Sequence, residues 1–188
     1  MLNGNKGITI DGIQHPRAIY TLWTEAERNA IGIYSIVYDD TNKKDEKWYI
    51  NTNQSYAFAN NKVTATYGNA TAKAHADTLW TAQDETDGLG TEGEVATRGL
   101  KYNLIQTVKA QAAGELSKTD WYITRKAEKN TAIPSAITTH RNAVRSKQAA
   151  METAITNASD TAALETLYTA TKQDDGTVAR PLGQLPTL

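Results

Sequence analysis

Short runs of alternating hydrophobic and polar residues characterise the start of the chain. Residues 7–10 and 13–15 alternate on either side of Asp11-Gly12. An Asp-Gly pair between alternating runs favours a tight hairpin turn, because glycine tolerates the positive φ that such turns require. We therefore expect a first antiparallel hairpin here, stopped by Pro16.

Two further β signals follow before residue 70. The run at 33–38 is rich in β-branched and aromatic residues, which favours a strand. Residues 55–59 and 62–67 flank Asn60-Asn61, and asparagine adopts the left-handed conformation of hairpin turns more readily than most residues. Residues 1–69 therefore predict a small, antiparallel, β-rich N-terminal part.

The hydrophobic spacing changes to a helical period in the second half. One apolar stripe recurs every four residues: Leu100, Leu104, Val108, Ala112 and Leu116. After Pro134, which suits a first helical turn, a second stripe contains Ile137, Val144, Met151 and Ile155. Two long amphipathic helices joined by a structured connection pack antiparallel. Residues 94–188 thus predict a helical hairpin, with an extended tail that contains two of the four prolines.

The intervening residues, 70–93, predict a connection between these parts. Residues 70–83 are rich in alanine and have a helical composition, so a short helix is expected there. Residues 84–93 hold three glycines and several acids, which is typical of a flexible, solvated linker. The predicted fold class is α+β, with a β-rich N-terminal part followed by the helical hairpin.

Composition and charge exclude several classes of protein. Hydrophobic residues make up 39% of the chain, so the core must be modest. The net charge of −1 argues against a general nucleic-acid or membrane-surface binder, because both need a basic excess. No apolar run approaches the roughly 20 residues that span a bilayer. The absence of cysteine removes disulfides, thiolate metal sites and cysteine nucleophiles.

The residue types that bind metals or transfer protons are scattered. His15, His75 and His140 lie in separate segments, without the closely spaced ligands of a zinc site. Two acidic loops lack the spacing of a calcium-binding loop and are interpreted as solvated turns: Asp39, Asp40, Asp45 and Glu46 in the first, and Asp84, Glu85 and Asp87 in the second. We expect no metal site, no cofactor and no catalytic residue.

Glycines and tryptophans have similarly structural interpretations. Gly88, Gly90 and Gly93 imitate a dinucleotide-binding loop, but no hydrophobic strand precedes them, and nearby glutamates would repel a pyrophosphate. The four tryptophans (Trp23, Trp48, Trp80 and Trp121) are spread over the whole chain and are expected to anchor cores or interfaces. Trp48-Tyr49, beside Lys47, comes nearest to a platform for a sugar or a base.

The segment TDWYITRKAEK, at 119–129, separates the two helical stripes. Thr119 or Asp120 can cap a short helix that holds the corner of the hairpin. We expect Trp121, Ile123 and Ala127 to face the neighbouring helices and the charged residues of the segment to face water.

The longer stretch TDWYITRKAEKNTAIPSAITTHRNAVRSK, at 119–147, resembles the C-terminal module of tail-associated structural proteins of tailed bacteriophages, particularly those of marine bacteria. His15-Pro16, Leu22-Trp23 and residues 27–33 agree with the same pattern, whereas residues 41–93 match it less well. Members of this family are virion tail, tail-fibre or baseplate components, or are encoded beside tail-fibre assembly factors. The resemblance implies a non-enzymatic structural protein.

The function expected from this resemblance is a tail, tail-fibre or baseplate adaptor subunit, made in the host cytoplasm and located in the virion tail. Its partners would be other tail, fibre or baseplate proteins and copies of itself. A tail-fibre assembly chaperone, absent from the mature particle, is the alternative. An enzyme acting on surface glycans is a third hypothesis, and Asp39 with Asp45 and Glu92 with Glu94 are its carboxylate pairs.

Overall fold

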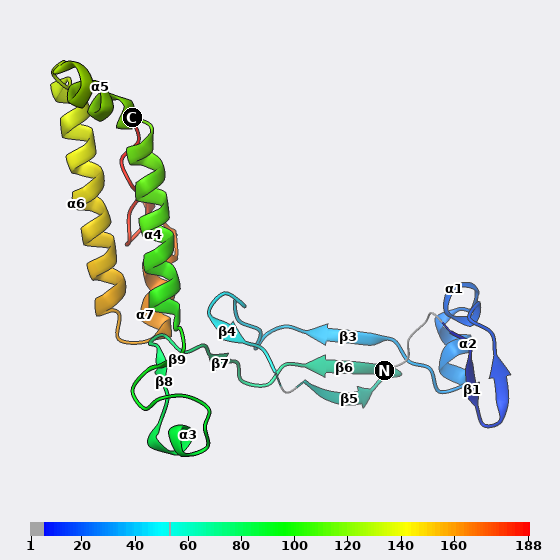
Figure 1. Cartoon of the computed structure of the whole chain (residues 1–188). Coiled ribbons are helices and arrows are strands. Elements are labelled where there is room, and N and C mark those ends of the chain that lie inside the picture. Colours follow the sequence, from blue (N-terminus) through cyan, green and yellow to red (C-terminus); the bar gives the residue numbers. More distant parts are fainter. Residues whose placement is uncertain (1–5, 53) are drawn as a thin grey trace. The chain divides into compact units, whose positions relative to one another are not determined.

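The chain divides into two compact units, Met1–Thr71 and Ala72–Leu188, in a computed structural model that describes residues 6–52 and 54–188 (Figure 1). Strands and long helices are both present, with small antiparallel sheets, which confirms the predicted α+β class. The division falls close to the end of the predicted β-rich part at residue 69.

The N-terminal unit begins with a hairpin and two short helices: β1 (Ile8–Ile10), β2 (Ile13–His15), α1 (Ile19–Leu22) and α2 (Glu25–Ala30). β1 and β2 pair antiparallel, and Asp11 and Gly12 both adopt positive φ between them. The predicted first hairpin is therefore confirmed. Thr24 and Glu27 form a reciprocal capping box at the start of α2.

Three strands form the largest sheet of this unit: β3 (Ile36–Asp39), β5 (Ser55–Ala59) and β6 (Lys62–Thr66), in the order β3-β6-β5. β5 and β6 form the predicted antiparallel hairpin around Asn60 and Asn61, whose φ values are 51° and 57°. β3 pairs with β6 in parallel, which the sequence did not predict. An alternating pattern sets which face a strand buries, but not the direction of its neighbour. The short β4 (Tyr49–Ile50) precedes β5, and β7 (Thr71–Ala72) lies where the units divide.

The prediction of a short helix at residues 70–83 is wrong. After β7, the chain forms β8 (Thr78–Leu79), a short helix α3 (Ala82–Thr86) and β9 (Val95–Thr97), and β8 pairs antiparallel with β9. The Trp80 N–H donates to the carbonyl of Glu94, and Gly93 donates back to Trp80. Pairing with a distant strand outweighs the helix propensity of the alanines. Residues 84–93 form the far end of this hairpin, inside the second unit.

The helical hairpin lies in the second unit and consists of α4 (Leu100–Ser117), α5 (Asp120–Lys129) and α6 (Ser135–Asn157). α4 and α6 lie side by side and run antiparallel, joined by α5 (Figure 1). Lys101, near the start of α4, donates to the carbonyl of Thr156, near the end of α6, over 2.8 Å. Both predicted stripes supply the core, which includes Leu104, Val108, Ala112, Ile137, Val144, Met151 and Ile155.

The C-terminal segment returns along these helices. Asp160 caps α7 (Thr161–Tyr168) by accepting the N–H of Ala163 over 2.7 Å. A small hairpin of β10 (Thr171–Lys172) and β11 (Val178–Ala179) follows. The N–H of Leu182 then donates to the carbonyl of Leu167, and Leu182 is buried.

Candidate functional site

The β3-β6-β5 sheet has one apolar face. Its register aligns Tyr56 with Ala65 and Phe58 with Val63 across β5 and β6. The same register aligns β3 with β6, so one face carries Ile36, Tyr38, Tyr56, Phe58, Val63 and Ala65. We call these six residues the apolar sheet face. The opposite face carries mainly small and polar residues, because side chains alternate along each strand.

Much of the apolar sheet face is open to solvent. Ala65 is fully buried, but Tyr38, Tyr56 and Phe58 are 55%, 51% and 58% exposed. The ring of Tyr34 packs against that of Phe58, with ring centroids 4.4 Å apart. Large apolar side chains clustered on a surface mark interaction sites more often than isolated ones do.

A hollow of about 610 Å³ adjoins this face. Its lining residues come from the two short helices, from the segment leading into β3 and from the sheet: Tyr20, Arg28, Ile33, Tyr34, Ser35, Ile36, Tyr56 and Val63. Aromatic and aliphatic side chains with one arginine at the border are typical of a surface that receives another protein.

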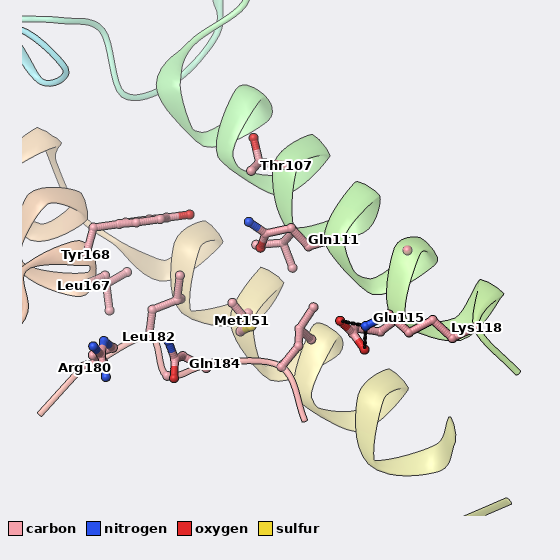
Figure 2. A pocket seen from close by; sticks show the side chains of 14 residues that line it. Thr107, Gln111, Glu115, Lys118, Met151, Leu167, Tyr168, Arg180, Leu182 and Gln184 are labelled. Atoms are coloured by element: carbon pink, nitrogen blue, oxygen red, sulfur yellow. Dashed lines mark hydrogen bonds and ion pairs between the residues drawn. The ribbon is translucent and has the colours of Figure 1, made fainter. Parts of the chain in front are cut away.

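The second unit has a cavity of about 590 Å³ between its helices and the C-terminal segment (Figure 2). Gln111 and Glu115 of α4 line one side, and Leu182 and Gln184 line the side formed by the C-terminal segment. Met151 of α6 and Tyr168 of α7 also line it. The cavity is therefore bounded by elements far apart in the sequence.

Two charged residues of this cavity, Glu115 and Lys118, pair with each other. Glu115 binds Lys118 through both carboxylate oxygens, at 2.7 and 2.8 Å. Burial raises the pKa of the Tyr168 phenol above its ordinary value. The cavity is a recess between the packed helices and the C-terminal segment.

Arg141 organises the corner of the helical hairpin, a structural role that was not predicted from the sequence. Its guanidinium, 8% exposed, donates from Nη1 to the Leu116 carbonyl, the Thr119 hydroxyl and the Asp120 carboxylate. Thr119 is fully buried. The signal in the sequence is a basic residue four positions after Ile137 and three before Val144, inside the apolar stripe.

The predicted orientation of α5 is wrong. None of its residues is buried, and Trp121 and Ile123 are 51% and 42% exposed. Trp121 packs instead against Tyr122, and the guanidinium of Arg125 lies 4.6 Å from the Trp121 ring centre. Arg141 holds the start of α5 through polar contacts, so the aromatic side chains are not needed to attach it to the hairpin.

The three histidines lie in three different settings. His15 packs edge-on against Trp23, with ring centres 5.6 Å apart. His75 precedes α4 in a non-helical segment, and its carbonyl accepts the N–H of Lys101. His140 is half-buried in α6. Among residues 6–52 and 54–188, no group of three or more potential ligand side chains is arranged to hold a metal ion.

The acidic loops serve local structure. The Thr41 hydroxyl and N–H donate to Asp39 and lower the pKa of that carboxyl. The hydroxyl and N–H of Thr81, the N-cap residue of α3, donate to the Asp84 carboxylate and lower its pKa. Asp45 accepts the N–H of Lys47 in the same turn-like way. The contacts of Asp39 and Asp45 agree with the interpretation as solvated turns. For the second acidic loop that interpretation is wrong, because Asp84 and Glu85 lie in the first turn of α3.

The pair Asp77 and Gly99 joins the β8–β9 hairpin to the start of α4. The carboxylate of Asp77 accepts the Gly99 N–H over 2.8 Å and an Arg98 N–H over 2.7 Å, and both contacts lower the pKa of Asp77. A Cβ on Gly99 would collide with the Ala76 carbonyl group. No local sequence pattern indicates this junction, because it connects residues that are 22 positions apart.

The remaining glycine and tryptophan candidates are structural. Gly90 lies so close to the Trp80 ring that a Cβ there would overlap it, so the glycines at 88–93 shape this loop. Trp48 and Tyr49 are 3% and 7% exposed. They belong to the core and do not form a platform for a sugar or a base.

Comparison of the chain with protein-family models, with curated proteins and with solved structures found no match. In the described part of the chain, no helix combines the length and the apolarity needed to cross a membrane.

Proposed function

We propose that this protein is a non-enzymatic structural subunit of a bacteriophage virion, located in the tail, tail fibre or baseplate. It joins neighbouring virion proteins as an adaptor after its synthesis in the host cytoplasm. The proposal combines the resemblance of residues 119–147 to phage tail proteins with an exposed apolar surface on the N-terminal unit.

The observation that carries the proposal is the apolar sheet face of the N-terminal unit. In the described part of this unit, only Ile19, Trp48, Tyr49 and Ala65 are buried hydrophobic residues. Seven large hydrophobic residues are exposed there: Ile13, Leu22, Val37, Tyr38, Ile50, Tyr56 and Phe58. A unit with so small a core gains stability when a partner covers its apolar surface.

The test is quantitative mass spectrometry of purified, intact particles of the phage that encodes the chain. A structural subunit is retained in these particles at a fixed ratio to the major tail protein, because symmetric assembly sets its copy number. A tail-fibre assembly chaperone would instead be abundant in infected cells and missing from washed particles. That second result would overturn the proposal and favour the chaperone.

A further inference from the structure

β5 forms an open edge of the three-stranded sheet (Figure 1). All five of its residues are exposed, and its register with β6 runs from Ser55 to Ala59 without a shift. Natural proteins protect such edges with lysine, proline, bulges or very short strands, because a free edge pairs readily with another chain. The sequence SYAFA has none of these protections.

The direction of the backbone groups on β5 follows from its hairpin. The two-residue turn Asn60-Asn61 makes Ala59 and Lys62 a hydrogen-bonded pair, and hydrogen-bonded and non-bonded pairs then alternate. Phe58–Val63 and Tyr56–Ala65 are therefore non-bonded pairs. The Val63 N–H supports this assignment, because it donates to the Ser35 carbonyl on the β3 side, over 3.1 Å.

It follows that the N–H and C=O groups of Tyr56 and Phe58 point away from β6, toward the open edge. No strand lies beyond β5 in the described sheet. These groups are spaced as an incoming antiparallel strand requires.

We propose that a second copy of this chain docks here, β5 against β5, with a two-fold axis at Ala57. Tyr56 of each copy then stands opposite Phe58 of the other, and each such pair exchanges both of its backbone hydrogen bonds. Ser55 stands opposite Ala59, and Ala57 faces Ala57. The register satisfies all of the outward-pointing groups of Tyr56 and Phe58.

Charge favours a second copy over a different protein. A two-fold axis brings like charges together, and like charges directly opposite on paired strands are destabilising. Residues 51–61 contain no charged side chain, so two copies meet at this edge without such repulsion. An edge adapted to a different, charged partner would carry complementary charges.

The sheet geometry also extends the apolar sheet face. Tyr56 and Phe58 lie on that face, so the two faces join into one surface across three strands from each copy. Cross-strand aromatic pairs of this kind stabilise antiparallel sheets. The inference concerns the sheet alone and holds whether or not the protein belongs to a virion.

The first test is analytical ultracentrifugation of the full chain at micromolar concentration. The wild-type chain is expected at twice its monomer mass of 20.5 kDa. Ala57→Asp and Ala57→Lys each place like charges at the axis, so each variant alone is expected to be a monomer. Mixing the two variants restores the dimer, because opposite charges then face each other.

The matched control is Val37→Lys. Val37 on β3 and Ala57 on β5 both align with Thr64 of the central strand β6. The Val37 side chain therefore lies on the same face of the sheet as that of Ala57, but at the opposite edge. This variant remains a dimer. A monomeric wild-type chain, or a failure of the mixed charge variants to associate, would overturn the proposal.

A second variant tests the register without adding charge. The chain has no cysteine, so Ala57→Cys places a single thiol at the axis. Mild oxidation is expected to join two copies efficiently, because facing residues of a non-bonded pair lie close enough for a disulfide. Val37→Cys forms no such product. Equal cross-linking of the two variants would show that another surface mediates contact. Circular dichroism confirms that each variant is folded, so neither outcome depends on a folding defect.

Discussion

The guanidinium of Arg141 donates a 2.7 Å hydrogen bond to the hydroxyl of Thr119, and both residues are buried. The Thr119 hydroxyl in turn donates a hydrogen bond to the Leu116 carbonyl over 3.0 Å. The Asp120 carboxylate, 2.8 Å from Arg141, balances its charge. This network connects α6 to the end of α4 and the start of α5, so one cation sets the corner of the helical hairpin.

Replacing Arg141 with methionine is expected to lower the free energy of unfolding by about 2–3 kcal/mol, because hydrogen bonds to a charged group are lost and the Thr119 corner loses its partner. Chemical denaturation followed by helical circular dichroism measures this change. Arg145→Met, at an exposed position one turn later, is the control and should change stability by less than about 0.5 kcal/mol. If the two substitutions lowered stability equally, the conclusion that Arg141 stabilises the corner of the helical hairpin would be contradicted.

Two glycine substitutions in the second unit are expected to act in opposite directions. Gly99→Ala is destabilising, because the added Cβ meets the backbone of Ala76, which cannot move independently. Gly114→Ala adds a methyl group in open space within α4 and should stabilise the protein by about 0.5–1 kcal/mol. Thermal unfolding of both variants, beside the wild-type protein, checks the prediction. A stabilised Gly99→Ala variant would contradict the close packing at the start of α4.

Asp77 should make stability depend on pH. The Gly99 N–H and Arg98 lower the pKa of Asp77 from its ordinary value of 3.8, so folding favours the ionised carboxylate. The ionised Asp77 carboxylate contributes to the free energy of unfolding at pH values above its ordinary pKa. This contribution disappears as the pH falls through the lower pKa of the folded state. Asp77→Asn is therefore less stable than the wild-type protein at neutral pH, and the difference between them narrows in acid.

Melting temperatures measured from neutral to acidic pH test this expectation. Glu128→Gln removes one negative charge from an exposed position of α5 and serves as the control. If the difference in melting temperature between wild type and Asp77→Asn widened toward acidic pH, folding would not lower the pKa of Asp77, and the prediction would be wrong.

Trp48 and Trp121 should respond differently to substitution by alanine. Trp48 is 3% exposed, so its removal is expected to cost about 3–5 kcal/mol through the loss of buried contacts. Trp121 is half exposed, so its removal should cost less than about 1 kcal/mol. Chemical denaturation curves of the two variants measure these changes in the free energy of unfolding. A large loss of stability in Trp121→Ala would mean that α5 packs through its aromatic side chains after all.

Local patterns predicted the elements whose structure depends mainly on nearby residues. The stripes that begin at Leu100 and Ile137 specify α4 and α6, because the helical period brings side chains four residues apart onto one face. Asp11-Gly12 and Asn60-Asn61 specify hairpins, because the backbone conformation of a turn is set by its own residues.

Long-range contacts decided the other features. Residues 70–83 have a helical composition, yet Thr78 and Leu79 pair with β9, whose position the local sequence does not reveal. The parallel alignment of β3 with β6 likewise depends on a neighbour more than 20 positions away. At the helical corner, the apolar Trp121 remains exposed while the charged Arg141 is buried.

The sequence by itself determined the α+β class, two hairpins and the two long helices, because these follow from the periodicity and conformational preferences of adjacent residues. Only the tertiary structure decided the strand order, the burial of Arg141 and the open edge of β5. These features depend on which distant groups meet, since a buried cation requires partners from another helix and an edge is defined by the strand that is missing beside it.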